Sequence, residues 1–328
     1  MRHLPFLATF FLVVQMPEWS AQTDAGDCPD GLISLDEDSI YKAVNLLATT
    51  SYPQIRKNDL QNMQHAVFDE LRNLKVALVV VDFQNDFISG SLKIQDGSAN
   101  EDPLEAIAPL NALTSDSALD LVVFTQDWHP YDHISFVESA CNTDRSIKQN
   151  GSCKSLKPFD AVEFEDPPVE QVLYPRHCVQ NSWGAELHKE VTIPDEAIFI
   201  RKGTQVLVDS YSAFNDNNGH KLVELEKLLE SNGITVVLGC GLAYDICLRH
   251  TLTDANELGY LTGVVRDCSK GLSSEGIEET TRQFACENIA VLDSEVVKRI
   301  LRKKIMPIEW VKRIMERSMK HGTSESIE

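Results

Sequence analysis

The stretch that decides the fold is Val76-Ala77-Leu78-Val79-Val80-Val81-Asp82. Its apolar residues follow one another without a polar interruption, and the run ends at a carboxylate. A short apolar run rich in valine is typical of a strand that is buried on both faces of a parallel sheet. In open parallel sheets, ligands bind beyond the carboxyl ends of the strands. We therefore expect Asp82 to lie at the functional edge of such a sheet.

Strand-like and helix-like segments alternate on the C-terminal side of this run. The further strand candidates are Leu119–Thr125, Ala197–Ile200, Thr235–Leu238, Leu261–Val265 and Ala290–Leu292. The helix candidates are Pro103–Ser115, His220–Asn232, Asp245–Leu258 and Gly276–Glu287. Such alternation predicts an α/β fold, with an open, mostly parallel sheet and helices on both of its faces. Residues 138–173 show no clear pattern, and we interpret them as a surface insertion.

The composition excludes several classes of partner. The chain has 328 residues, with 30 Lys and Arg against 50 Asp and Glu, so its formal net charge is −20. A surface of this charge repels the phosphates of nucleic acids and of anionic membranes. Hydrophobic residues make up 43% of the chain, which is ordinary for a globular protein. No segment has the roughly 20 apolar residues that a membrane span requires.

The two ends of the chain differ from its middle. Residues 1–21 combine a basic start, a short apolar run and Trp19-Ser20-Ala21, which predicts a cleaved signal peptide and secretion. A cytosolic protein with an apolar N-terminus is the alternative.

Residues 22–73 are predicted to form an acidic helical extension. Within them, residues 26–37 resemble a calcium loop with poor ligands at its first and third places, and we expect this loop to bind nothing. Residues 303–328 are predicted to form a basic helix, ending near His321, and a tail. Residues 74–302 then form the main domain.

Reactive or ligand-type side chains follow the strong strand candidates. They are, in chain order, Asp82, Asp127, His129, Lys202 and Cys247. Cys247 lies near the start of a predicted helix, where the helix dipole and the cation of Lys202 would favour the reactive thiolate. Asp82 could accept the thiol proton and pass it to a leaving group. The backbone N–H groups of the turn Leu242–Cys247 could hold an oxyanion.

A metal site is a second possibility at the same edge. Asp127 and His129 are two residues apart, so in extended backbone their side chains point to one side. His177 could complete a zinc-type site with open positions for water, and His133 is a candidate fourth ligand. Such a set of carboxylate and imidazole ligands accepts zinc, iron or manganese.

Blocks of sequence in a fixed order resemble a known family. The blocks are Asp82-Phe83-Gln84-Asn85-Asp86-Phe87, Asp127-Trp128-His129-Pro130 with His133-Ile134-Ser135-Phe136, Tyr174-Pro175-Arg176-His177-Cys178 with Trp183-Gly184, Lys202-Gly203, and Gly241-Leu242-Ala243-Tyr244-Asp245-Ile246-Cys247. Together they resemble the nicotinamidase group of the isochorismatase-like cysteine hydrolases. The resemblance covers about residues 75–292 and leaves both ends of the chain outside it.

The resemblance implies a six-stranded parallel sheet and a catalytic triad. The triad would be Asp82, Lys202 and Cys247. It also implies a divalent metal, commonly zinc, with the ligand set Asp127, His129, His177 and, as a further candidate, His133.

The resemblance also implies how the substrate is bound. The N–H groups of Ala243 and Cys247 would form the oxyanion hole, with a non-proline cis peptide bond before Ala243. Phe87, Gln84 and Tyr174 match residues of the substrate pocket. The implied reaction is hydrolysis of nicotinamide to nicotinate and ammonia through a cysteine thioester, as a step of NAD salvage.

Two alternative functions remain open at the level of sequence. One is a metal-free relative that hydrolyses another amide or an enol ether, against which the metal-type residues argue. The other is an inactive secreted binding protein of the same fold, against which the intact triad argues.

The cysteines carry a further prediction. The chain has eight cysteines, and a free Cys247 leaves seven, so at least one more must be unpaired in a secreted protein. Cys141 and Cys153 flank a short segment of the insertion and are the best candidate for a disulfide. Between them, Asn150-Gly151-Ser152 is a glycosylation acceptor if the chain enters the secretory pathway.

Overall fold

The computed structural model describes residues 31–148, 153–165 and 168–324. Several of the expectations concern residues outside these ranges. The signal peptide at residues 1–21, the first places of the calcium-like loop, the glycosylation acceptor at residues 150–152 and the last four residues all lie outside the described part.

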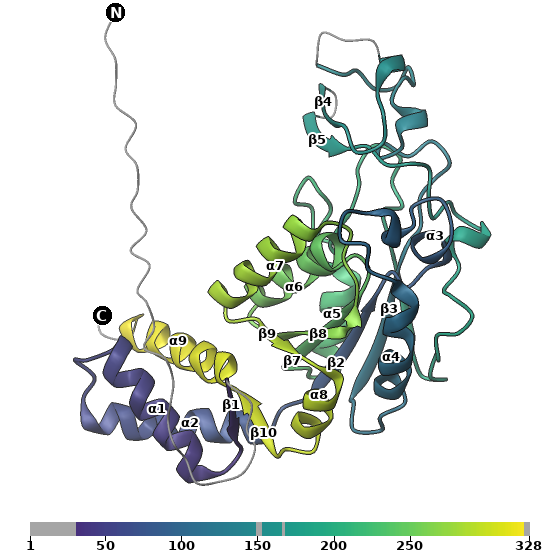
Figure 1. The fold of residues 1–328 in the computed structure, drawn as a ribbon. Helices are drawn as coiled ribbons and strands as arrows, with labels where there is room; N and C mark the ends of the chain where they lie inside the picture. Colours follow the sequence, from purple (N-terminus) through teal and green to yellow (C-terminus); the bar gives the residue numbers. More distant parts are fainter. Residues whose placement is uncertain (1–30, 149–152, 166–167, 325–328) are drawn as a thin grey trace, which may run out of the picture.

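The central element is a six-stranded sheet with the order β6-β3-β2-β7-β8-β9 (Figure 1). Its strands are β2 (Val76–Val81), β3 (Leu121–Asp127), β6 (Ile198–Lys202), β7 (Val236–Gly241), β8 (Leu261–Ser269) and β9 (Ala290–Leu292). All neighbouring pairs in this sheet are parallel. The predicted open parallel sheet is therefore confirmed, and β2 occupies a central position between β3 and β7.

Strand β2 is buried on both faces because its side chains enter two different cores. Leu78 and Val80 belong to one apolar cluster, whereas Ala77 and Val79 belong to a second one. This division follows from the strand geometry, in which successive side chains point to opposite faces. The uninterrupted apolar run of the sequence is the direct consequence.

Helices cover both faces of the sheet. The first cluster includes apolar residues of α4 (Ile107–Thr114) and α8 (Ser294–Leu301). The second includes residues of α5 (Val223–Ser231), α6 (Arg249–Glu257) and α7 (Ser274–Cys286). The predicted three-layer architecture is confirmed, with element ends that differ from the predicted ones by a few residues.

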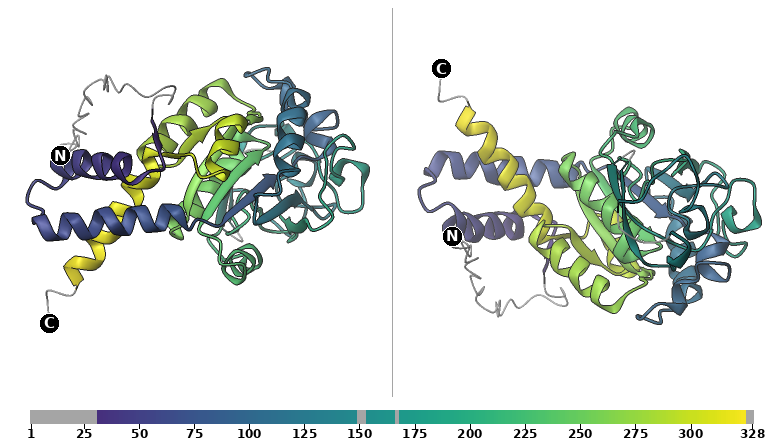
Figure 2. Two further views of the ribbon diagram at one scale, coloured as in Figure 1. Left: turned by 90° about the horizontal axis from the view of Figure 1, so that it is seen from below. Right: turned by 90° about the horizontal axis from the view of Figure 1, so that it is seen from above.

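The N- and C-terminal segments form one additional layer, which the sequence did not indicate. Strand β1 (Leu32–Ser34) pairs antiparallel with β10 (Ile305–Pro307). The helices α1 (Glu37–Ser51), α2 (Lys57–Arg72) and α9 (Ile308–Ser324) lie together at one end of the molecule (Figures 1 and 2). Helix α9 continues past His321, where we expected it to end.

Helix α9 connects this terminal layer to the sheet. Trp310 is fully buried, and its Nε1–H donates a hydrogen bond of 2.8 Å to the carbonyl oxygen of Thr262 in β8. Arg317 donates to the carbonyl oxygen of Gly259, just before β8. The terminal layer therefore packs at the end where β8 begins, which is the end opposite to the expected functional edge.

The insertion has more structure than its sequence predicted. Strands β4 (Ala161–Glu165) and β5 (Pro168–Val172) form an antiparallel hairpin. Ile134 and four residues of the insertion form a small buried apolar cluster; the four are Ala140, Val162, Phe164 and Leu173. The predicted disulfide between Cys141 and Cys153 is confirmed.

A short helix, α3 (Asn85–Ile88), follows β2. Within the described ranges, none of the helices has the length and apolar character that a bilayer crossing demands.

Candidate active site

The carboxyl ends of β2, β3 and β6 bring three charged side chains together. The ammonium group of Lys202, at the end of β6, lies 2.8 Å from Oδ2 of Asp82 and also contacts Oδ1 of Asp127. It lies 3.4 Å from Sγ of Cys247, in the turn after β7, and 3.1 Å from the carbonyl oxygen of Ser210. The three predicted triad residues thus form one contact network.

This network is buried, and burial controls its protonation. Lys202 and Asp82 are both at most 1% exposed. Burial raises the pKa of Asp82 to about 6, although Lys202 opposes the rise. Burial also disfavours the charged form of Asp127, but Lys202 and the neighbouring histidines outweigh it and lower the pKa of that carboxyl. The pKa of Asp82 is therefore raised and that of Asp127 is lowered. Such a pair is common in sites where one carboxyl group transfers protons and another stays ionised.

Burial and the neighbouring charges act on the nucleophile in opposite directions. Burial raises the pKa of Cys247 well above its ordinary value, and the nearby carboxylates add to the rise. Lys202 lowers it, but by less. Burial therefore opposes the thiolate that the helix start and the lysine favour. The proton of the thiol must leave during the reaction, and a nearby base is needed.

The turn around Cys247 offers N–H donors to the pocket. Cys247 lies in a π-helical turn, Tyr244–Leu248, rather than at the start of an ordinary α-helix. The peptide bond between Leu242 and Ala243 is cis, as the resemblance implied. Among the described residues, the N–H of Ala243 has no hydrogen-bond partner. Because Ala243 lines the same pocket as Cys247, this free donor is available to a ligand.

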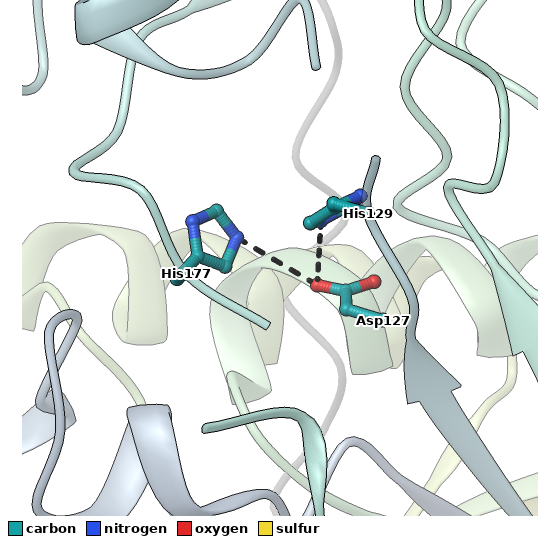
Figure 3. A group of neighbouring side chains, drawn as sticks. All are labelled: Asp127, His129 and His177. Atoms are coloured by element: carbon teal, nitrogen blue, oxygen red, sulfur yellow. Dashed lines mark ion pairs between the residues drawn. The ribbon is translucent and has the colours of Figure 1, made fainter. Parts of the chain in front are cut away.

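Asp127, His129 and His177 form a second cluster beside the triad. Nε2 of His129 and Nε2 of His177 lie 3.5 Å and 3.9 Å from Oδ2 of Asp127 (Figure 3). Each Nδ1 lies 2.8 Å from a backbone carbonyl oxygen, that of Gly203 or that of Pro175. These carbonyls hold the proton on Nδ1 and turn the lone pair of Nε2 toward Asp127. Histidines that bind a metal through one ring nitrogen typically donate the N–H of the other nitrogen to a carbonyl or carboxylate oxygen, as here. The donor set therefore fits a divalent metal ion.

His133 does not join this cluster. Its Nε2 lies 3.2 Å from the carbonyl oxygen of Val208, to which it can only donate. Its Nδ1 accepts hydrogen bonds from Ser135. Both ring nitrogens are thus engaged, and His133 stacks on His129 with ring centroids 4.1 Å apart. In this arrangement it supports His129, and its part as a fourth ligand stays a prediction. His129, His133 and Asp209 form a further group whose ligand atoms lie within 4.8 Å of one another.

Gln84 also differs from its expected role. Its Oε1 accepts the N–H of Asp127 at 2.9 Å, and its Nε2 donates to the carbonyl oxygens of Asp127 and Ala185. The side chain is fully buried and is not among the residues that line the pocket. Gln84 is therefore a positioning residue for Asp127 and not a wall of the substrate pocket.

A pocket joins Cys247 of the triad to Asp127 and His177 of the second cluster. It is lined by Phe87, Leu92, Ile94, Asp127, Tyr174, His177, Asp209, Tyr211, Ala243, Ile246, Cys247 and Leu272. Phe87 and Tyr174 line it as expected. Apolar side chains with a few polar groups at one end are typical of a site for a small, flat ligand.

A model of the isochorismatase domain matches residues 76–296. The chain belongs to the isochorismatase family. Among curated members, the nicotinamidase of Acinetobacter baylyi is 35% identical over 200 residues, which are 61% of this chain and 83% of that protein. The nicotinamidase of Saccharomyces cerevisiae is 34% identical over 226 residues, which are 66% of this chain and 98% of that protein.

Solved structures of the isochorismatase family agree with this assignment. A nicotinamidase and pyrazinamidase from Acinetobacter baumannii has a TM-score of 0.59 and 32% identity, over 69% of this chain and 99% of that one. Yeast nicotinamidase bound to the inhibitor nicotinaldehyde has a TM-score of 0.54 and 32% identity, over 66% and 99%. A pyrazinamidase from Pyrococcus horikoshii in complex with zinc has a TM-score of 0.50 and 30% identity, over 67% and 99%.

Some residues of this isochorismatase-family site escaped the sequence analysis. Asp209 and Tyr211 line the pocket from an irregular loop that follows β6. Asp86 accepts the N–H groups of Ser91 and Cys178, so it anchors the segment that carries His177. No strand end marks the first two, and their only sequence signal is that a polar, aromatic segment follows Lys202.

Proposed function

We propose that the protein is a nicotinamidase, which hydrolyses nicotinamide to nicotinate and ammonia. The observation that carries the proposal is the combination of two clusters on one small pocket. The contact network of Asp82, Lys202 and Cys247 supplies amide-hydrolysing chemistry, and the cluster around Asp127 fits a metal ion. The identity of 35% to one nicotinamidase and of 34% to another supports the same substrate.

The first half of the reaction uses Cys247 and Asp82. The ligand atoms of Asp82, Asp127 and Cys247 lie within 4.8 Å of one another, so the thiol proton can pass to Asp82. Sγ of Cys247 attacks the carboxamide carbon and forms a C–S bond. Asp82 then gives the proton to the amide nitrogen, the C–N bond breaks and ammonia leaves. A carboxyl group with a pKa of about 6 is suited to both directions of transfer near neutral pH.

The second half hydrolyses the thioester. Water gives a proton to Asp82 and attacks the thioester carbon, the C–S bond breaks, and Asp82 returns the proton to the sulfur. The acid that forms loses its remaining proton to solvent and is released as nicotinate, and the thiol is regenerated. In both halves Lys202 stabilises negative charge on Asp82 and on the sulfur, and the N–H groups of Ala243 and Cys247 are the candidate oxyanion donors.

Asp127, His129 and His177 are the residues that would hold a divalent metal, most commonly zinc, with iron and manganese as alternatives. When bound, the ion would supply a Lewis-acid contact for the pyridine nitrogen of the substrate. The chain itself contributes the shape of the site, since Phe87 and Tyr174 flank the space next to His177. A flat ring between them would place its amide group toward Cys247.

Specific observations argue against the two rival functions. A metal-free hydrolase would have no need for two buried histidines whose Nε2 atoms face one carboxylate. An inactive binding protein would have no need for a buried lysine in contact with two carboxylates and a thiol. The direct test is ammonia release from nicotinamide by the purified protein with zinc, iron or manganese supplied. Release that is lost after strong chelation supports the proposal, and no release with any of the metals contradicts it.

We also propose that the protein is secreted and that its activity is a step of NAD salvage. The disulfide between Cys141 and Cys153 supports an oxidising environment, because such bonds are rare in reducing compartments. Expression of the full chain in an animal cell line, followed by mass spectrometry of the medium, tests this. Secreted protein that starts close to residue 22 supports the proposal, and full-length protein found only inside the cells contradicts it.

A further inference from the structure

Asp209 is a pocket residue to which the reaction above assigns no role. It lines the pocket together with Cys247 and is 4% exposed. Its Oδ1 accepts the N–H of Ser210 at 2.8 Å, and its Oδ2 accepts Nε2–H of Gln171 at 3.2 Å. Gln171 is itself buried and comes from strand β5 of the insertion. The carboxylate is thus held in place from two directions.

Asp209 and Asp127 both line the pocket, but they differ in the charged groups that lie next to them. Asp127 contacts the ammonium group of Lys202. Among the described residues, no lysine or arginine lies within ion-pairing distance of Asp209. Its histidine neighbours are His129, with a ring nitrogen within 4.8 Å of a carboxylate oxygen, and His133, with Nε2 at 3.9 Å from Oδ1. The ring of His133 accepts the N–H of Ser135 at Nδ1 and faces a carbonyl oxygen with Nε2, so it is a neutral imidazole.

The proposed reaction changes the charge of the bound molecule. A neutral carboxamide enters the pocket, and an anionic carboxylate is present after ammonia has left and the thioester has been hydrolysed. An unpaired carboxylate on the wall of a buried pocket repels an anion but exerts little net force on a neutral amide. Between two negative charges several ångströms apart, in a medium of intermediate dielectric constant, this repulsion weakens the affinity for the anion by roughly tenfold or more.

We propose that Asp209 is a specificity-determining residue that weakens binding of the carboxylate product relative to the neutral amide substrate. This inference rests on the proposed function. Gln171 is the positioning residue that holds Asp209 toward the pocket, and it links the insertion to substrate selection. The class of ligand favoured by the site is an uncharged aromatic carboxamide, and the class disfavoured is an aromatic carboxylate.

The test compares substrate and product affinity in Asp209→Asn. This substitution removes the charge and keeps the size and an acceptor oxygen for Gln171. We expect the inhibition constant of nicotinate to fall about tenfold, whereas KM for nicotinamide changes by less than about threefold. The variant Asp209→Glu keeps the charge and should retain the weak inhibition of the wild type. If Asp209→Asn does not turn over, the dissociation constant of nicotinate from calorimetry replaces the inhibition constant.

Asp120→Asn is the matched control. Asp120 also accepts a backbone N–H, that of Val76 at 2.7 Å, but it precedes β3 and lies at the opposite end of the sheet. Its substitution should leave the nicotinate affinity unchanged. Unchanged nicotinate affinity in Asp209→Asn, or an equal change in Asp120→Asn, would overturn the inference while leaving the proposed function intact. A wild type that releases no ammonia would overturn both.

Discussion

The two ends of the central sheet are built from opposite kinds of contact. At the carboxyl ends of the strands, buried charged groups such as Lys202 and Asp82 contact one another. At the other end, the terminal layer of α1, α2 and α9 packs apolar side chains against each other and against the sheet, with Trp310 fully buried. Buried charges cost free energy of desolvation, and apolar burial supplies it. The difference indicates that one end carries the chemistry and the other contributes stability.

The largest effect is expected from Cys247→Ala. Loss of the sulfur removes the nucleophile, so ammonia release should fall by about four orders of magnitude or more. The thermal unfolding midpoint should stay close to that of the wild type, because the substitution removes one small buried side chain. Kinetics and calorimetry on the same preparation measure both. Cys286→Ala, at an exposed cysteine of α7, is the control and should match the wild type in activity. Residual activity of a tenth or more in Cys247→Ala would contradict the assigned nucleophile.

Trp310→Ala should show the reverse pattern. The lost burial and the lost hydrogen bond to Thr262 should lower the free energy of unfolding by about 3–5 kcal/mol. The kcat of the folded fraction at 25 °C should remain near the wild-type value, since the residue lies at the far end of the sheet. Denaturant titration and steady-state kinetics check the two parts. Trp183→Ala, at a residue that is 55% exposed, should be nearly neutral. If the fall in kcat, expressed as a free energy, equals the loss in unfolding free energy, the two ends of the sheet do not have separate roles.

The disulfide in the insertion should contribute measurably to the stability of the protein. Replacing Cys141 and Cys153 together by serine removes a link across a sequence separation of 12 residues, which should cost about 2–4 kcal/mol. The measurement is the unfolding midpoint with and without reductant. Reductant should lower the midpoint of the wild type to that of the double variant and leave the double variant unchanged. A wild type that does not respond to reductant, after its thiols have been shown to be free, would rule out a stabilising role.

The smallest effect is expected from Gln84→Met. This variant keeps the volume but leaves the N–H of Asp127 without its acceptor, so Asp127 is held less firmly. Residues that orient a metal ligand typically contribute 10–100-fold in metal affinity. Competition with a chelator should show zinc bound about 10–100-fold more weakly. Gln283→Met, on α7 and bonded to Thr253 and Glu287, should bind zinc like the wild type. Equal affinities of the two variants would mean that Gln84 has no positioning role.

How much of the site was predictable depends on where each residue lies. Asp82, Lys202 and Cys247 were predicted because parallel strands deliver their carboxyl ends to one edge, and the apolar strands are visible in the sequence. His129 and His177 followed from ligand type and from the family resemblance. Asp209 lies in an irregular loop, and its position depends on Gln171 from the insertion, so no local pattern indicated it.

The local pattern of residues by itself determined the parallel sheet, the order of its strands along the chain and the placement of Asp82, Lys202 and Cys247 at one edge of that sheet. Each of these depends on the alternation of buried strands with helices, which hydrophobic periodicity encodes directly. Only the tertiary structure decided that β1 pairs with β10, that Gln84 holds Asp127 and that burial raises the pKa of the Cys247 thiol. The physical reason is that these features arise from contacts between distant segments. Burial and the field of neighbouring charges exist only once those segments have come together.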